Sequence, residues 1–143
     1  MNLNMDMAQK LMSAYHQKCK PLCQQLGLPQ TAFDILMFLA NNPNYKTASD
    51  IVEVRKIKAN LVSVNVNRLV EDGYLIRKSV KDDRRKTLLI CTPKAEPIIE
   101  QGRLVQKSFF DTLFTNISKQ SREEFFETLE IIHKNLDDIL KEE

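Results

Sequence analysis

The sequence predicts a mainly α-helical protein with one short β-hairpin. Apolar residues recur at helical spacing along most of the 143-residue chain, and only three glycines and five prolines are present to make tight turns. Two apolar stretches near the middle, YLIRKSV and TLLICT, have the length and residue types of strands. Between them lies KDDRRK, residues 81–86, six charged side chains that predict a polar joint between the two strands.

Length and composition are those of a single folded domain covering residues 1–143. Hydrophobic residues make up 43% of the chain and charged residues 28%, which suits a protein with an ordinary core. No apolar run reaches the roughly 18 residues of a membrane span, and the first ten residues lack a signal-peptide pattern. Three cysteines at uneven spacing do not predict a disulfide framework, so we expect a cytoplasmic protein with reduced thiols.

Two helices are expected in the first third of the chain. The first covers about residues 4–25, and Pro21, late in its apolar pattern, should kink this helix or end it early. The second runs from Pro29, which suits a first helical turn, to about Asn41. The segment NNPNY that follows is expected to be a loop.

A pair of shorter helices follows, joined by a brief turn. Thr47 is the expected N-cap of the helix ASDIVEV, with Asp50 three residues later as an approximate capping box. The second of the pair runs from about Lys58 to Asp72 and stops at Gly73. Its apolar stripe consists of Val62, Val66 and Leu69. Its opposite, mostly hydrogen-bonding face carries Lys58, Asn60, Ser63, Val64 and Asn67.

Two further helices are expected after the hairpin. Thr92 and Pro93 open one that runs to roughly Asn116, and Ser121 with Glu124 forms a capping box for the last helix. Apolar residues recur at helical spacing along this last helix, at Phe125, Phe126, Leu129, Ile132, Leu136, Ile139 and Leu140.

Charge is distributed unevenly along the chain. Residues 53–86 carry ten cations against five anions, a net charge of +5, whereas residues 118–143 carry four cations against eight anions, a net charge of −4. A basic segment inside a folded domain indicates a polyanionic partner, although a solvated surface that binds nothing is the alternative. An exposed polar helix suits the DNA major groove, and a cationic hairpin tip suits the neighbouring minor groove. These parts together predict a winged helix-turn-helix.

At these residues the chain resembles the multiple-antibiotic-resistance regulator (MarR) family of bacterial transcription factors over most of its length. LPQTAFDILMFL is similar to the family's second helix, and TASDIVEVRKIKANLVSVNVNRLVEDGYLIR is similar to its helix-turn-helix and first wing strand. DDRRKTLLICTPKAE is similar to the wing motif, an Asp-x-Arg followed by a strand and a new helix. Here the motif is Asp83-Arg84-Arg85, and Cys91-Thr92 replaces the usual Leu-Thr. Many relatives carry a second hydroxyl and an Arg where this chain has Leu61 and Val64, so base preferences do not carry over.

The resemblance implies a homodimer that binds a near-palindromic operator in double-stranded DNA, and a repressor that a small molecule or an oxidant releases. It implies dimerisation through helices at about 4–25 and 93–141, on either side of a DNA-binding core at about 29–92. Asp83 is expected to position Arg85. The residues implied in DNA binding are Thr47, Lys58, Asn60, Ser63, Val64, Asn67, Lys81, Asp83, Arg84, Arg85 and Lys86.

One face of the first helix carries His16, Cys19 and Cys23, at i, i+3 and i+7. Such cysteines usually pack in the core as small unreactive side chains. The alternatives are a thiol sensor or a metal site completed by a ligand from elsewhere. Cys91 is expected in the core, and His133 at the surface or at an interface. We expect no resident metal and no cofactor.

Several aromatic residues suit either ordinary core or an apolar effector pocket near the dimer interface, and core is the commoner outcome. The candidate pocket residues are Tyr15, His16, Cys19, Phe33 and Phe109. For Arg68, near the end of its helix, pairing with an acidic neighbour and contact with a DNA phosphate are both open.

Motifs of catalysis are missing from the sequence. There is no phosphate-cradling glycine loop, no nucleophile elbow and no paired-histidine metal motif, and two histidines leave few candidates for acid–base chemistry. The sequence therefore predicts a protein that is not an enzyme. The alternative from another class is an interaction module, in which the winged helix docks a protein partner.

Overall fold

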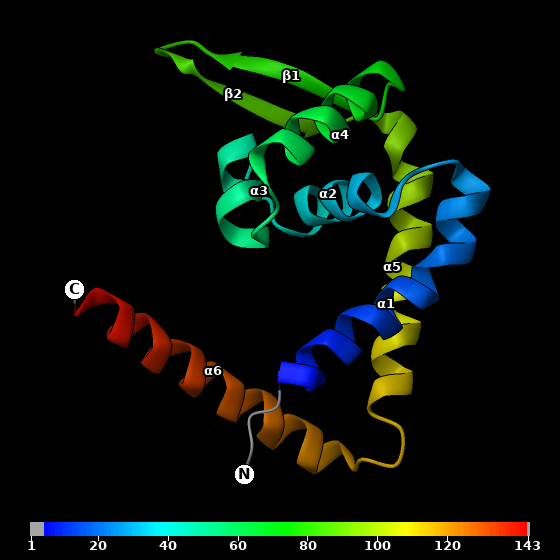
Figure 1. Cartoon of the computed structure of the whole chain (residues 1–143), viewed down its shortest axis with the longest axis vertical. Helices are drawn as coiled ribbons and strands as arrows, with labels where there is room; N and C mark the ends of the chain where they lie inside the picture. Colours follow the sequence, from blue (N-terminus) through cyan, green and yellow to red (C-terminus); the bar gives the residue numbers. More distant parts are fainter. Residues whose placement is uncertain (1–4, 143) are drawn as a thin grey trace. The chain divides into compact units, whose positions relative to one another are not determined.

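The structure is a computed structural model that describes residues 5–142, and it is mainly helical within that range (Figure 1). In chain order its elements are α1 (Met5–Leu26), α2 (Gln30–Asn41), α3 (Ala48–Arg55), α4 (Ala59–Glu71), β1 (Leu75–Val80), β2 (Asp83–Cys91), a 3-10 turn (Pro93–Ala95), α5 (Glu96–Leu113) and α6 (Lys119–Lys141). The chain forms two compact units, of which the first ends at Lys107 and the second begins at Ser108. The boundary between the predicted DNA-binding core and dimerisation helices stays a prediction.

The first helix is longer than its proline suggests. α1 continues through Pro21 to Leu26, so the expected early end is wrong, while the ribbon of α1 bends along its length in Figure 1. A proline removes one hydrogen bond of the helical ladder, and the remaining turns still hold when the apolar face on both sides is packed. The predicted start at residue 4 lies outside the described residues. Gly27, at a φ of +65°, then reverses the chain into α2.

α2 is the centre of the first unit's core. Seven of its residues are buried, because the helix contacts both α1 and α4. The main cluster joins α2 to the helix-turn-helix and the hairpin, through residues such as Leu36, Ile51, Leu69 and Leu75, none more than 1% exposed. A burial of this kind contributes roughly 1.5–3 kcal/mol for each large side chain, and it joins the helix-turn-helix, α2 and the hairpin through one core.

α5 approaches this core closely at Gly102. A Cβ placed on Gly102 would lie 2.5 Å from the sulfur of Met37 and 3.1 Å from a ring carbon of Phe33. Only a residue without a side chain lets α5 and α2 pack at this separation. Larger residues would have to displace buried side chains, which generally costs about 1–3 kcal/mol.

The second unit contains the end of α5 and all of α6. Ser118, not Ser121, caps α6: its hydroxyl oxygen accepts the backbone N–H of Ser121 at 3.1 Å. The predicted capping box at Ser121 is therefore wrong by three residues. Asn116, at a φ of +66°, turns the chain after α5. Ser118 then has the extended backbone conformation that an N-cap requires, three residues before Ser121.

Among residues 5–142, none of the helices combines the length and the apolar character that a membrane crossing requires.

Candidate nucleic-acid interface

The short helix α3 is held by the capping box that the sequence predicts. The hydroxyl of Thr47 accepts the backbone N–H of Asp50 at 3.1 Å, and the Asp50 carboxylate accepts the backbone N–H of Thr47 at 3.1 Å. Slight burial acts to raise the pKa of Asp50, but these hydrogen bonds and one from the N–H of Lys46 lower it below its ordinary value. An ionised Asp50 therefore stabilises the start of α3 at neutral pH.

The turn between α3 and α4 contains a strained residue. Lys56 follows the last residue of α3 and has a φ of +56°, in the left-handed region that β-carbons disfavour. Lys58 is the N-cap of α4 and returns the chain to an extended conformation. This sharp reversal sets the direction in which α4 leaves α3, so contacts that hold the turn also hold α4.

α4 separates its residues into two faces as the sequence predicts. Val62, Val66 and Leu69 are buried beneath it, together with Asn65, whose side chain donates to the carbonyl of Leu61 at 2.8 Å. The predicted contact residues on the other face are all exposed: Lys58, Asn60, Ser63, Val64 and Asn67. Val64 is 65% exposed, an apolar side chain placed in solvent at the middle of this face.

The hairpin after α4 is longer than KDDRRK suggests. β1 pairs with β2 in antiparallel register from Leu75 opposite Cys91 to Ser79 opposite Thr87, with an irregularity between Ser79 and Val80. Only Lys81 and Asp82 form the turn, so the expectation of a six-residue joint is wrong. The remaining four residues of that segment belong to β2: Asp83 lies opposite Val80, and Arg84, Arg85 and Lys86 bulge from the ladder before Thr87.

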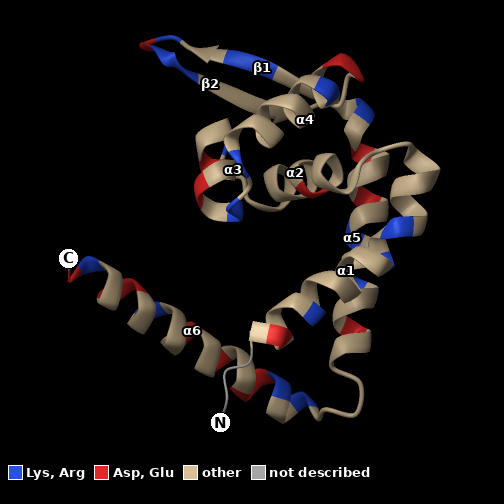
Figure 2. Ribbon diagram, in the orientation of Figure 1, with Lys and Arg blue, Asp and Glu red and all other residues tan. Residues whose placement is uncertain are grey.

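The predicted wing residues lie at the free end of this hairpin. Lys81, Asp83, Arg84, Arg85 and Lys86 are all exposed. The Asp83 carboxylate accepts the backbone N–H of Arg85 at 3.0 Å, so it contacts the Arg85 main chain. Figure 2 shows basic segments on β1 and toward the hairpin tip, beside an acidic segment at the tip itself.

Arg77 is a residue of this face that the sequence analysis did not single out. It lies on β1, and its guanidinium donates a short hydrogen bond to the side-chain oxygen of Asn67 on α4. One of the predicted base-contacting residues is thus tied to the wing. A cation at an exposed strand position, ten residues after an Asn on the preceding helix, is too common a pattern to have indicated this pair.

For Arg68 the structure favours the structural alternative. Its guanidinium donates to the carbonyl of Gly27 at 2.8 Å and lies 3.7 Å from the Asp72 carboxylate. The bond to Gly27 fastens the end of α4 to the loop between α1 and α2.

The face of α1 that carries His16, Cys19 and Cys23 splits into a buried and an exposed part. Cys19 is fully buried, and Cys23 is 7% exposed, in a cluster with Phe33 and Met37. Burial raises the pKa of both thiols, that of Cys23 to about 11. His16 is exposed and turns toward Asp34. Among the described residues, no group of three or more His, Cys, Asp or Glu side chains is arranged to hold a metal ion. The packing alternative therefore fits these thiols best.

This burial predicts slow thiol chemistry. At pH 7.5 we expect Cys19 and Cys23 to react with N-ethylmaleimide at least about 100-fold more slowly in the folded protein than in denaturant, because little thiolate forms and little of it is accessible. Mass spectrometry of quenched samples measures the rates, and a Cys91→Ser variant removes the third, half-buried thiol. Rapid modification of Cys19 or Cys23 in the folded protein would restore the thiol-sensor alternative.

The proposed pocket residues do not share one environment. Phe33 and Cys19 have no exposed surface, whereas the hydroxyl of Tyr15 accepts the side-chain N–H of Gln106 at 3.0 Å. Phe109 belongs to the second unit, where its ring packs edge-on against Phe110. An open cleft of about 950 Å³ does include His16, with Lys20, Gln24 and Arg68 among its other lining residues.

Comparisons with known proteins agree with this geometry. Residues 26–86 match the sequence model of the MarR family. A Thauera aromatica protein assigned to transcriptional regulation of the hcr operon is 26% identical over 110 residues, which cover 75% of this chain and 66% of that protein, just under two thirds of its length. The HTH-type transcriptional regulator BilQ of Clostridium symbiosum is 20% identical over 116 residues, which cover 81% of this chain and 80% of BilQ.

Solved structures show the same fold. A MarR family regulator from Listeria monocytogenes, crystallised in complex with a 26mer DNA, aligns with a TM-score of 0.82 at 16% identity, over 96% of this chain and 91% of that chain. The predicted fold class, mainly helical with a β-hairpin wing, is thereby confirmed.

Proposed function

We infer that this chain, which matches the MarR family model over residues 26–86, is a dimeric transcriptional regulator that binds a near-palindromic operator. Regulators of this family are not enzymes. The observation that carries the proposal is the combination, in one compact unit, of an exposed polar face on α4 with a basic hairpin directly after it. Such a helix reads base edges in a major groove while the hairpin contacts the neighbouring minor groove.

The residue roles in this proposal follow from chemistry and exposure. Asn60, Ser63 and Asn67 offer hydrogen bonds to base edges, and Val64 offers apolar contact to a thymine methyl group. Asn67 must exchange its bond with Arg77 for one with DNA, or bind while held by it. Lys58 and Thr47 lie at helix starts, where phosphate contact is favourable. Lys81, Arg84, Arg85 and Lys86 supply the positive charge of the wing.

A second copy of the chain is the expected partner in solution. α6 has no buried residue, and its apolar stripe remains 37–72% exposed from Phe126 to Leu140. An exposed apolar surface of this length is unfavourable in water, and a symmetric dimer covers the same surface on both copies. Dimerisation then presents two α4 helices, which reach successive major grooves if they lie roughly 34 Å apart.

Regulation in this proposal is steric. A dimer that occupies a promoter blocks transcription, and a small molecule or oxidant that changes the spacing of the two α4 helices releases it. The open cleft beside His16 is a place where a small molecule has access. Such a regulator acts on DNA in the cytoplasm.

Selection of bound duplexes from a random pool, at about 50 and 200 mM salt, tests the function. We expect enrichment of a palindrome whose half-sites lie one helical turn apart, with affinity that falls steeply as salt rises because phosphate contacts release counterions. Weak binding that does not enrich any sequence and barely responds to salt would contradict the proposal and favour docking of a protein partner.

A further inference from the structure

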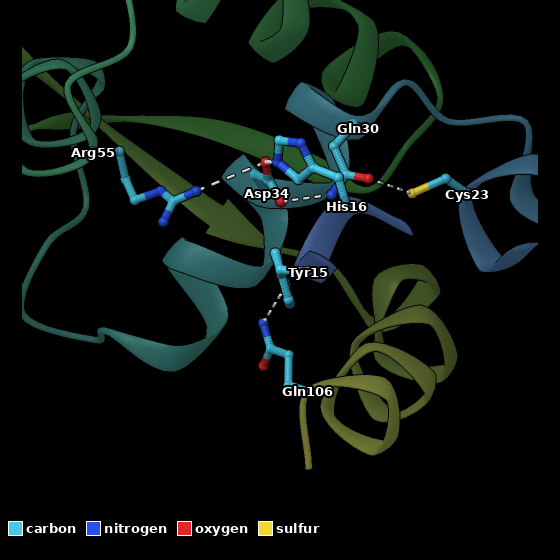
Figure 3. Close-up of polar contacts among 7 residues, drawn as sticks. All are labelled: Tyr15, His16, Cys23, Gln30, Asp34, Arg55 and Gln106. Atoms are coloured by element: carbon cyan, nitrogen blue, oxygen red, sulfur yellow. Dashed lines mark hydrogen bonds and ion pairs between the residues drawn. The ribbon is translucent and has the colours of Figure 1, made fainter. Parts of the chain in front are cut away.

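Asp34 is a half-buried residue in the apolar helix α2, and its carboxylate is largely shielded from water. Its side chain is 9% exposed, and its neighbours in sequence, Phe33 and Ile35, are fully buried. One carboxylate oxygen, Oδ1, accepts the side-chain N–H of Gln30 at 2.9 Å (Figure 3). The Cys23 thiol donates to the side-chain oxygen Oε1 of Gln30 at 3.8 Å, which orients the Gln30 side-chain amide toward Asp34.

The other oxygen of Asp34 is shared by two groups from different helices. His16 Nε2, from α1, lies 3.7 Å from Oδ2, and an Arg55 guanidinium nitrogen, from α3, also lies 3.7 Å from Oδ2. Figure 3 shows the two side chains approaching Asp34 together. Since Oδ1 is bound to Gln30, the two groups compete for the same oxygen.

Arg55 lies directly before the turn that leads into α4. It is the last residue of α3, and the next residue is the strained Lys56, after which α4 begins. The ion pair between Arg55 and Asp34 therefore fastens one side of the α3–α4 turn to α2. His16 connects the same carboxylate to α1, a helix proposed to lie in the dimer interface.

The ionised form of Asp34 destabilises the folded protein. Burial raises the pKa of Asp34, an effect that Gln30, Arg55 and His16 oppose only in part. When folding raises the pKa of a carboxyl, the folded state becomes less stable as pH rises through the titration of that carboxyl. Ionised Asp34 therefore makes the fold less stable at neutral pH. Removing the charge of Asp34 therefore relieves part of this destabilisation.

We propose that Asp34 is a positioning residue for α4, acting through Arg55, and that protonation of His16 weakens this hold. The proposal rests on the proposed function, because α4 is taken as the DNA-reading helix. With His16 neutral, Arg55 is the sole cation at Oδ2. With His16 protonated, two cations share that oxygen and repel each other, so the turn before α4 loosens and DNA affinity falls.

Histidine is the side chain that commonly changes charge near physiological pH, so the test compares a neutral and a mildly acidic pH. The helices near His16 carry several charged and titratable groups. They are Asp34 on α2, Arg55 on α3, Arg68 on α4, and Tyr15, Cys19, Lys20 and Cys23 on α1 itself.

The first test compares DNA affinity at pH 7.5 and 5.5 for the wild type and the His16→Gln variant, which has no charge at either pH. We expect the wild type to lose about fivefold or more relative to His16→Gln, a typical size for coupling between two sites. Lys18→Gln, which removes an exposed cation from the same helix α1, should keep the wild-type response. Parallel pH profiles for the wild type and His16→Gln would overturn the proposal.

The second test separates positioning from plain stability. Asp34→Asn should weaken binding about fivefold at pH 7.5 and leave the thermal midpoint equal or higher, and Arg55→Gln in the same background should add little. Loss of affinity together with a lower midpoint in Asp34→Asn would overturn the proposal, because the residue would then be merely structural.

A measurement without DNA distinguishes failure of this proposal from failure of the proposed function. The backbone N–H of Val62 donates to the Lys58 carbonyl at 3.0 Å and closes the first turn of α4. Its hydrogen exchange, corrected for intrinsic rates, should be faster at pH 5.5 than at 7.5 in the wild type and unchanged in His16→Gln. Absence of that difference would overturn the inference whether or not the protein binds DNA.

Discussion

Replacing Leu136 and Ile132 on α6 with Glu is expected to convert a dimer into a monomer and to abolish high-affinity operator binding. The two side chains are 52% and 46% exposed in a single chain, at neighbouring positions of the apolar stripe. A symmetric interface contains each substitution twice, so four charges would lose water. Burying unpaired charge is far more costly than burying a leucine is favourable, at roughly 1.5–3 kcal/mol.

Sedimentation equilibrium across a range of protein concentrations measures this effect. We expect the dissociation constant of the dimer to rise by about 100-fold or more, while circular dichroism of the monomer remains helical. Lys134→Glu is the matched control, since it reverses a charge on the opposite face of the same helix and should leave the dimer intact. If the double variant stayed dimeric, the apolar stripe of α6 would not be the interface.

Arg85→Ala is expected to weaken operator binding roughly 10- to 100-fold, the usual cost of losing one well-placed arginine. Arg85 lies near the free end of the hairpin, and its backbone is held by the Asp83 carboxylate at 3.0 Å. A wing that reaches the minor groove places this cation in the most negative potential of the duplex. Because the side chain is exposed, the thermal midpoint should not change.

The salt dependence of affinity gives this prediction a second measurement. Loss of one phosphate-neutralising cation should reduce the slope of log affinity against log salt by about 1. Lys18→Ala, which removes an exposed cation from α1, should change neither affinity nor slope. Equal effects from Arg85→Ala and Lys18→Ala would mean that general charge, and not the wing, attracts DNA.

The two predictions test separate halves of the mechanism. A monomeric α6 variant should retain weak, salt-sensitive binding to one half-site, because its α4 and wing are intact. The Arg85 variant should remain a dimer with weakened affinity for the full operator. A protein-interaction module would show neither dependence.

Local sequence patterns correctly predicted several elements of this molecule. The helical spacing of Val62, Val66 and Leu69 identified the buried side of α4, and Thr47 with Asp50 marked the start of α3 correctly. The strand pair around the basic segment was also predictable, although the segment's own backbone proved to be mostly strand. Hydrophobic periodicity, helix capping and local charge depend on residues a few positions apart, so they can be recognised in the sequence.

Contacts between distant residues were decided only by the tertiary structure. An aspartate among the apolar residues of AFDILMFL was a visible anomaly, but nothing in the sequence indicated that His16 and Arg55 would share one of its oxygens. The tie between Arg77 and Asn67, and the close approach of α5 at Gly102, depend likewise on how separate elements pack. Residue patterns predicted most of the elements, the two faces of α4 and the basic wing, because these arise from short-range chemistry. The tertiary structure alone decided which polar side chains meet, because that depends on the placement of whole helices against a common core.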